Sequence, residues 1–494
     1  MKLKTKLLSL WSITVVITFN LSAQTVEFIE PRNVQGVPEA DFYTYKVGDN
    51  FYVLQKKYRM MAPVMYDLQL DAYDANRKPI GTNTIDKTLE MGDANIYEGV
   101  FALKDKLVMF KSEFSKASGA KMSYLYYYPF DVSGKRQKKM SLTSFIAESA
   151  FNSGNFSVNV SPDGSKVAVI SELPYEKEGM EKCIVTVYDG NFKKLWKKDY
   201  TFAYESSKAP KNTIFINNNG VVFLLKQINL KKAFDQFSMF TFTGDGKTVV
   251  EKKIDLGNGF VIATHKELFR TNGDLLIAGY SYMNKKVGVN VETPDGVFYL
   301  DVNASNGELN VAKLNVVKPS LVVAAQLLAL PDNSVCLVGE HRFVGSTSVT
   351  GKPMEYTYSY SYGSIHFTKF AADGSQSWNY TVDKDLKSIS DGGRFVSSYS
   401  WVNGSDINVL FADELSRHDE KKQFIEFGSK RVNLIQIIDA NGKFKAEMLI
   451  KDPRIGGKKG EYFFIPSTGN VYSNNKLFML ASRGLELVGA TITF

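Results

Sequence analysis

Apolar and polar positions alternate in short segments along almost the whole chain, and turn-forming residues separate these segments. The pattern is clearest in residues 156–200, where Pro162-Asp163-Gly164, a polar stretch and Asp189-Gly190-Asn191 divide four apolar segments. Alternation bounded by Asn, Asp and Gly is typical of antiparallel strands joined by tight turns. Residues 156–200 therefore predict a four-stranded antiparallel meander.

The same pair of turns returns about every 55–70 residues, which is the period expected of a β-propeller with loop insertions. The first turn can be placed eight times and the second seven times. The second turns are residues 74–76, 131–134, 189–191, 244–246, 303–307, 373–374 and 439–442. The sequence predicts an all-β fold, an eight-bladed β-propeller of four-stranded antiparallel blades. Seven blades is the alternative, if one unit has been divided wrongly.

The eighth unit is one strand short, because only KLFMLASR and LELVGATITF follow its first turn. A cleanly alternating segment, Thr25-Val26-Glu27-Phe28-Ile29-Glu30, is available near the other end of the chain. We expect this N-terminal strand to complete the last blade and to close the ring without an exposed strand edge. Residues 24–494 would then form a single propeller domain, without a helix of any length.

The connections between the predicted strands fall into two classes. The two turns of each unit are short and lie on one face of a propeller, whereas the remaining connections lie on the opposite face. The extra residues are expected only in the second class, namely residues 172–181, 282–295, 342–360 and 413–430 within blades and residues 85–95, 143–155, 383–394 and 451–460 between blades. A scaffold that elaborates one face is expected to use that face for recognition.

Residues 1–23 have the pattern of a cleaved secretory signal peptide. Lys2, Lys4 and Lys6 precede an apolar run that is too short to span a bilayer, and Ser22-Ala23 stands before Gln24. We therefore expect an exported protein, in the periplasm or associated with the outer membrane, that does not itself span the membrane. Removal of this segment lowers the formal net charge from +8 to +5, which does not favour nucleic acid as a partner.

Residues that would carry chemistry are sparse. The four histidines, His265, His341, His366 and His418, stand apart from one another and from Cys183 and Cys336, so we predict no metal site and no cofactor. The two cysteines fall in different repeats and are predicted to be free and buried. No catalytic residue is assigned, and whether the protein is an enzyme stays open, with a non-enzyme favoured. For a propeller enzyme, the candidate loop carboxylates are Glu172, Asp295, Asp391 and Asp413.

Aromatic and basic residues on the elaborated face are the predicted partner-binding residues. Tyr356, Tyr358, Tyr360 and Tyr362 alternate with Thr and Ser, so a strand would place the four rings on one side. This pattern indicates either a strand wedged between blades or an aromatic strip for a protein or a sugar. Arg454, Lys458 and Lys459 belong to a glycine-rich cationic segment, which is either a solvated loop or a site for an anionic group.

Residues 161–168, SPDGSKVA, resemble the blade motif of TolB-like and WD40-like propellers. Residues 189–196 and 373–378, which end in Trp196 and Trp378, resemble the last strand of quinoprotein-type blades, a family with both enzymes and a non-enzymatic outer-membrane assembly scaffold. Most units lack that tryptophan, so the resemblance does not imply a quinone cofactor. In its Lys, Asn, Tyr and Phe richness the chain is similar to exported propellers of Bacteroidetes-type bacteria, some of which serve type IX secretion, for instance as a translocon plug.

These observations lead to one main hypothesis and two alternatives. The main hypothesis is a non-catalytic exported propeller that binds a protein partner at the cell envelope through its loop-rich face, as a component or plug of an outer-membrane secretion or assembly machine. The first alternative is a propeller enzyme acting on carbohydrate, and the second is a sensor that holds a small ligand in the central channel.

Overall fold

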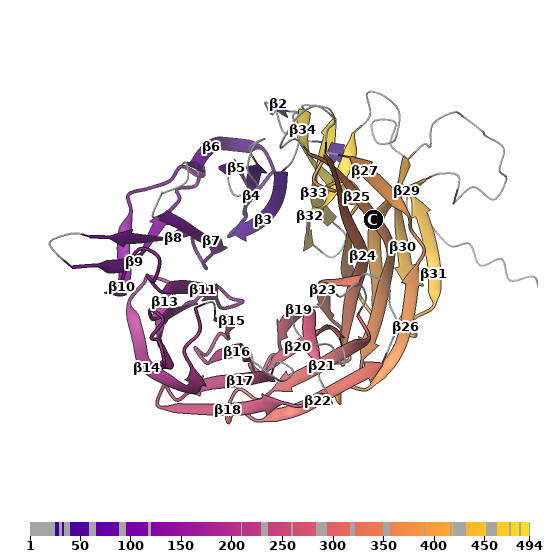
Figure 1. Cartoon of the computed structure of the whole chain (residues 1–494). Coiled ribbons are helices and arrows are strands. Elements are labelled where there is room, and N and C mark those ends of the chain that lie inside the picture. The colour runs from indigo at the N-terminus through magenta and orange to yellow at the C-terminus, as the bar shows by residue number, and fades with distance from the viewer. Residues whose placement is uncertain are drawn as a thin grey trace, which may run out of the picture.

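The computed structural model describes residues 25–28, 32–33, 40–58, 66–87, 95–116, 120–208, 210–228, 236–257, 260–282, 294–316, 322–348, 356–389, 391–414, 417, 431–450, 462–473, 476–483 and 486–493. The elements within these residues are all β-strands, and they pair into eight antiparallel sheets. In Figure 1 the sheets follow one another around a ring, in chain order.

Blades 1 to 4 each consist of four consecutive strands that run from the centre of the ring to its rim. Blade 1 contains β3 (Ala40–Val47), β4 (Asn50–Tyr58), β5 (Tyr66–Tyr73) and β6 (Pro79–Lys87). Blade 2 contains β7 (Asn95–Ala102), β8 (Leu107–Ser115), β9 (Met122–Pro129) and β10 (Met140–Ile146). Blade 3 contains β11 (Asn155–Val160), β12 (Lys166–Glu172), β13 (Met180–Asp189) and β14 (Lys194–Glu205). Blade 4 contains β15 (Lys211–Ile216), β16 (Val222–Ile228), β17 (Gln236–Thr243) and β18 (Thr248–Ile254).

Blades 5 to 7 repeat this order, with one additional strand in blade 6. Blade 5 contains β19 (Val261–Phe269), β20 (Leu275–Tyr282), β21 (Gly296–Val302) and β22 (Leu309–Val316). Blade 6 contains β23 (Val322–Ala329), β24 (Val335–Ser348), β25 (Tyr356–Phe370), β26 (Gln376–Val382) and the added β27 (Leu386–Ile389). Blade 7 contains β28 (Ser398–Asn403), β29 (Asp406–Glu414), β30 (Arg431–Ile438) and β31 (Phe444–Leu449).

Blade 8 is built from both ends of the chain, as the sequence predicts. Its inner strands are β32 (Phe463–Ser473), β33 (Lys476–Arg483) and β34 (Glu486–Thr493), and its outer strand is β1 (Thr25–Phe28). β1 pairs antiparallel with β34 in a register that places Val26 opposite Ile492, and the short β2 (Arg32–Asn33) pairs farther along β34. The eight-bladed prediction is therefore confirmed, and the seven-bladed alternative is wrong.

The core of the protein lies between blades rather than inside any one of them. Among the described residues, eight buried apolar clusters each join two neighbouring blades, including blades 8 and 1, where Phe478 and Leu480 pack against Phe51. A fully buried phenylalanine contributes about 2–3 kcal/mol through the area it removes from water. Because each interface needs apolar residues on both faces of the middle strands, strands such as β21 are buried at every position, whereas the outer β26 alternates.

The turns between the first and second and between the third and fourth strands of each blade form one face of the ring, here called the hairpin face. Four of the third-to-fourth turns share the sequence Asp-x-Asn/Ser-x-Lys and begin at Asp74, Asp131, Asp189 and Asp439. In each turn the aspartate Oδ1 accepts hydrogen bonds from the backbone N–H groups two and four residues later. The fourth residue of each turn has a positive φ, and the hydrogen bonds of the aspartate side chain help to hold that conformation.

That fourth position docks each of these turns on the preceding blade. The Phe192 ring lies 3.8 Å from the Tyr127 ring, and Arg77 stacks over Tyr472 of blade 8. At Gly442 a Cβ atom would lie 2.4 Å from the Trp378 ring, so only glycine fits there. The repeated turn therefore closes a strand pair and fixes the spacing between blades at once.

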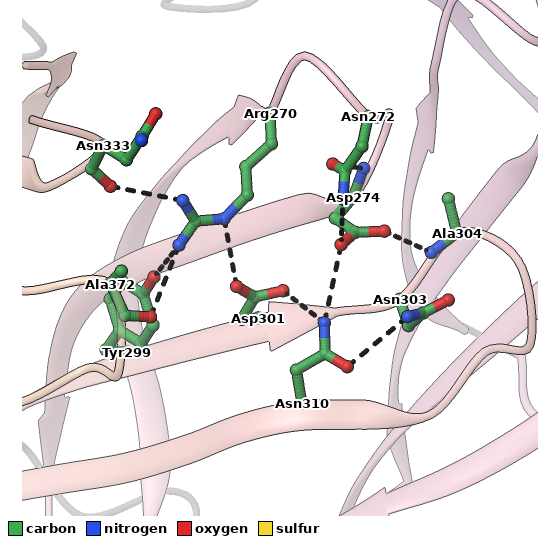
Figure 2. A network of polar contacts seen from close by, with 10 residues as sticks. All are labelled: Arg270, Asn272, Asp274, Tyr299, Asp301, Asn303, Ala304, Asn310, Asn333 and Ala372. Carbon is green, nitrogen blue, oxygen red and sulfur yellow. Dashed lines mark hydrogen bonds and ion pairs between the residues drawn. The ribbon is translucent and has the colours of Figure 1, made fainter. Parts of the chain in front are cut away.

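Between blades 5 and 6 an arginine from a first turn connects the turns of the two blades (Figure 2). Arg270, in the first turn of blade 5, donates to the carboxylate of Asp301 at 3.1 Å and to the hydroxyl of Tyr299 at 2.9 Å. The same guanidinium donates to the backbone oxygens of Asn333 and Ala372, which belong to two turns of blade 6. One side chain thus joins three turns of the hairpin face.

The opposite face, here called the loop face, carries the longer connections, but two of the predicted loops contain strands. Residues 342–360 were expected as a loop, whereas β24 continues to Ser348 and β25 begins at Tyr356. Residues 383–394 include β27, which pairs with β25 beside β26. Both differences have one cause: Phe343, Val344 and the alternating tyrosines have high strand propensity and extend the hairpin beyond its blade.

Candidate functional site

The loop-face ends of β24 and β25, together with β27, project as a three-stranded sheet that we call the blade 6 extension (residues 342–348, 356–362 and 386–389). The register aligns Val344 with Tyr360 and Ser388, and aligns Gly345 with Ser359 and Ile389. Because paired residues point to the same side of a sheet, the extension has two distinct faces. One face carries the tyrosines and Val344, and the other carries Phe343, Ser359 and Ile389.

The structure places the predicted tyrosines along one strand, with different degrees of burial. Tyr358 and Tyr360 are half-buried, and Tyr362 is buried in a small cluster with Leu386, Val396 and Ala412. The segment after β27 approaches closely, since a Cβ on Gly393 would lie 3.0 Å from the Tyr362 hydroxyl. The strip is thus covered by the chain at its Tyr362 end and is half-buried at Tyr360 and Tyr358. Its role in partner binding stays a prediction.

A buried ionic group holds the base of the extension. The Lys384 Nζ lies 2.7 Å from Glu340 Oε1, and both side chains are completely buried. Arg342 donates to the other carboxylate oxygen of Glu340, and Lys384 also donates to the backbone oxygen of Val396. Burial lowers the pKa of Lys384. Burial also opposes ionisation of Glu340, but Lys384 and Arg342 together lower the pKa of the Glu340 carboxyl. The ionised pair therefore fixes the covering segment to β24.

Three exposed residues of the extension are apolar. Phe343, Val344 and Ile389 are 51%, 54% and 67% exposed. Phe343 leans along its strand, because a Cβ on Gly345 would lie 3.2 Å from the Phe343 ring. Exposed single apolar residues are common on protein surfaces. Three of them on one projecting sheet, with Val344 on the tyrosine face and Phe343 and Ile389 on the other, are instead typical of a recognition surface.

A second polar group lies where β7, β11 and β15 begin, at the loop-face ends of three inner strands. Asn212 and Asn155 both donate to the carboxylate of Glu172, and Lys226 lies 2.5 Å from Glu181. Burial raises the pKa of Glu172, against the opposing hydrogen bond from Asn212.

Glu98, on β7, belongs to the same part of the loop face. Its carboxylate accepts a hydrogen bond from Ser112 at 2.5 Å, and burial raises its pKa to about 7, against that hydrogen bond and with a further contribution from the charge of Glu172. A carboxyl group with such a pKa can donate or accept a proton near neutral pH.

The other predicted carboxylates have structural partners. Asp413 is buried and lies 3.2 Å from the Nε of Arg417, while Asp391 accepts hydrogen bonds from the Ser388 hydroxyl and the Gly393 amide. Asp295 begins the chain that leads into β21, where its amide bonds to Ser281. Arg454, Lys458, Lys459, His418 and the predicted signal peptide lie outside the described residues.

The remaining chemical predictions concern metals, thiols and membrane spans. Cys183 and Cys336 are free and buried, as predicted, and burial raises the pKa of both thiols. In the part of the chain that the structure describes, no three His, Cys, Asp or Glu side chains gather as ligands for a metal ion. No helix within the same residues is long and apolar enough to cross a membrane.

Three features of the candidate sites have little or no signal in the sequence. The Glu340–Lys384 pair joins positions 44 residues apart, and neither residue belongs to a motif. The apolar surface of the extension had a weak signal, because HRFVGSTS combines aromatic and β-branched residues without an acidic residue. Glu98 interrupts the strand-like segment NIYEGVFA, which marks it only as a polar position on an inner strand.

Comparison with known proteins does not assign the chain to a family. Neither a protein-family model nor a curated protein matches the chain. Among solved structures, the WD40 domain of SCAP from fission yeast is 10% identical, with coverage of 96% of this chain and 98% of that one and a TM-score of 0.40. The polysaccharide lyase Uly1 is 12% identical, with coverage of 94% and 98% and a TM-score of 0.33. The propeller domain of the Trilobed protease from Pyrococcus furiosus is 11% identical, with coverage of 84% and 98% and a TM-score of 0.33.

These scores carry no conclusion about activity. The assignment as an eight-bladed propeller rests on the strand pairing of the chain itself.

Proposed function

We propose that this protein is a non-catalytic propeller that binds a protein partner through the blade 6 extension on its loop face. The observation that carries the proposal is that the three-stranded blade 6 extension projects from an otherwise regular ring and exposes Phe343, Val344 and Ile389. The buried Glu340–Lys384 pair supports it, since a rigid base reduces the entropy lost when a partner binds. The predicted signal peptide extends the proposal to an exported protein at the cell envelope, as a component or plug of an outer-membrane secretion or assembly machine.

The decisive experiment compares two matched surfaces. The triple variant Phe343→Ser/Val344→Ser/Ile389→Ser removes three exposed apolar side chains from the extension. The control variant Val132→Ser/Met140→Ser/Leu195→Ser removes three exposed apolar side chains from the hairpin-face ends of blades 2 and 3. Tagged forms of the wild type and both variants are expressed in the native cell, and the co-purified proteins are quantified by mass spectrometry.

We expect the extension variant to recover at least tenfold less of the partner that co-purifies stoichiometrically with the wild type, because apolar anchors dominate binding energy. The control variant should recover as much of this partner as the wild type. Thermal unfolding of all three proteins should agree within about 2 °C, since exposed substitutions change stability little. Equal partner recovery by the extension variant would exclude this surface. Cell fractionation of the wild type tests the exported location separately.

One observation keeps an enzymatic alternative in view. Glu98 and Glu172 both have raised pKa values and interact electrostatically, and a pair of carboxyl groups is what most carbohydrate-hydrolysing enzymes use. If the protein turns over a polysaccharide, Glu98→Gln and Glu172→Gln should each reduce kcat at least a hundredfold. Unchanged turnover in both variants would remove these acids from any reaction.

A further inference from the structure

The two edges of the blade 6 extension differ in how they are covered. On one side, β27 pairs antiparallel with β25 over residues 359–362, so the edge of β25 is occupied by a segment of the same chain. On the other side, β23 pairs with β24 only as far as His341, which lies opposite Val322. No strand among the described residues pairs with the β23 side of β24, the edge toward the centre of the ring, from Arg342 to Ser348.

The composition of the open edge is unusual for an edge that faces water. Natural proteins protect such edges with lysine, proline or a bulge, because unpaired N–H and C=O groups pair with other chains. The outer strands β14 and β18 follow this rule with Lys197, Lys198, Lys252 and Lys253. In contrast, residues 343–348, FVGSTS, contain no charge and no proline, and Phe343, Val344, Ser346 and Thr347 are exposed. From Phe343 to Ser348 the open edge therefore has neither a charge nor a proline to discourage pairing with another strand, and the register irregularity of β24 with β25 lies before it, between Glu340 and Arg342.

The occupied edge shows which kind of segment the extension accepts. β27 is a short extended strand whose Leu386 and Ser388 are buried against the tyrosine face, while Lys387 and Ile389 are exposed on the other face. A strand added to β24 would continue the same rows. Its side chains would lie beside Val344 on the tyrosine face and beside Phe343 on the other.

We propose that the open edge of β24, residues 342–348, takes an extended segment of a partner polypeptide as an added β-strand. The segment has apolar side chains at alternate positions and no charge along the paired stretch, since the edge offers it none from Phe343 to Ser348. This inference rests on the proposed function, and it specifies how the partner binds. The main-chain hydrogen bonds give the affinity, and the rows of Val344 and Phe343 give the side-chain preference.

A peptide probe tests the backbone pairing directly. Phage-displayed random decapeptides are selected on the purified full-length protein, and the tightest binder is synthesised in two N-methylated forms, one at odd and one at even positions. In an antiparallel or parallel pair only alternate amides point to the protein. We expect one form to bind at least tenfold more weakly than the unmodified peptide and the other form to bind about as well, as measured by fluorescence anisotropy.

Hydrogen exchange locates the binding site. We expect the unmodified peptide to protect the amides of residues 343–348 and to leave the hairpin face unchanged. The side-chain variant Phe343→Ala should weaken the peptide about tenfold without removing that protection, because it keeps the backbone groups. Selected peptides should have apolar residues at every second position.

Several outcomes would overturn the inference. Equal affinity of both N-methylated forms, or protection outside residues 343–348, would exclude strand addition. Protection of these amides in the free protein that rises with protein concentration, together with a dimer in sedimentation, would assign the edge to a second copy of the chain instead. If the apolar variant of the extension loses its native partner while both N-methylated peptides bind equally, the proposed function stands and strand addition falls.

Discussion

The hairpin face and the loop face are made from the same strands, and they follow different rules. On the hairpin face, one turn sequence recurs at Asp74, Asp131, Asp189 and Asp439, and each copy makes the same pair of hydrogen bonds. On the loop face, the described connections differ from blade to blade, and blade 6 alone carries a three-stranded extension. Repetition fixes the ring, whereas the individual connections are free to acquire a function.

The two faces also use charge differently. On the hairpin face, Arg270 is partly exposed and joins several turns through backbone oxygens as well as through Asp301. On the loop face, Lys384 and Glu340 are completely buried and hold a single local segment. A shared contact among many turns tolerates the loss of one bond, but a buried pair does not tolerate the loss of one partner.

The largest effect is expected at this buried pair. Lys384→Ala leaves Glu340 buried with Arg342 as its remaining cation, and breaking such pairs costs about 3–5 kcal/mol. Urea unfolding, followed by both fluorescence and circular dichroism, measures the loss. The double variant Glu340→Leu/Lys384→Met removes both charges, and we expect it to recover most of the stability. A Lys384→Ala midpoint equal to that of the wild type would show that the pair does not fix the segment.

The second effect separates docking from backbone strain within blade 7. Gly442 (φ 76°) and Gly404 (φ 61°) both have a positive φ, and a Cβ meets the Trp378 ring at Gly442 but nothing within 4 Å at Gly404. We expect Gly404→Ala to cost about 1 kcal/mol from strain alone, and Gly442→Ala about 3 kcal/mol because the Trp378 ring must also move. The same urea unfolding measures both. Equal losses would mean that the turn does not dock on blade 6.

The hairpin face could be predicted from the sequence because its information is local. The turn at Asp439 needs only the five residues from Asp439 to Lys443, and the alternation of residues 25–28 sufficed to assign β1 to the last blade. What the local pattern leaves open is the partner of the fourth turn residue. Phe192 and Gly442 occupy the same turn position, but Phe192 packs on Tyr127 and Gly442 on Trp378. Each of these partners belongs to the preceding blade, so the turn sequence alone does not identify it.

The candidate site was predicted only in part, for a physical reason. The alternating tyrosines were visible, but the cover over Tyr362 depends on Leu386 and Val396, which reach it through long-range packing. The expectation of a loop at residues 342–360 was wrong, because turn and strand propensities compete in the sequence RFVGST and pairing with β25 decides the outcome. Likewise, the raised pKa of Glu98 depends on how deeply β7 is buried, which no spacing of residues records.

The smallest expected effect concerns Glu98, and it extends the comparison to pH. Burial raises the pKa of the Glu98 carboxyl to about 7 in the folded protein, whereas an ordinary glutamate titrates near pH 4.5. The stabilising contribution of the protonated form is therefore complete below about pH 4.5 and is lost as the pH rises through 7. Glu98→Gln keeps a neutral side chain at every pH, so it should equal the wild type at pH 4 and exceed it by about 1 kcal/mol at pH 8, after allowance for partial solvent screening. Glu178→Gln, at a side chain that is 86% exposed, is the control and should leave the difference between the two pH values unchanged. A carboxyl carbon titration that places Glu98 near pH 4.5 would contradict the burial of this group.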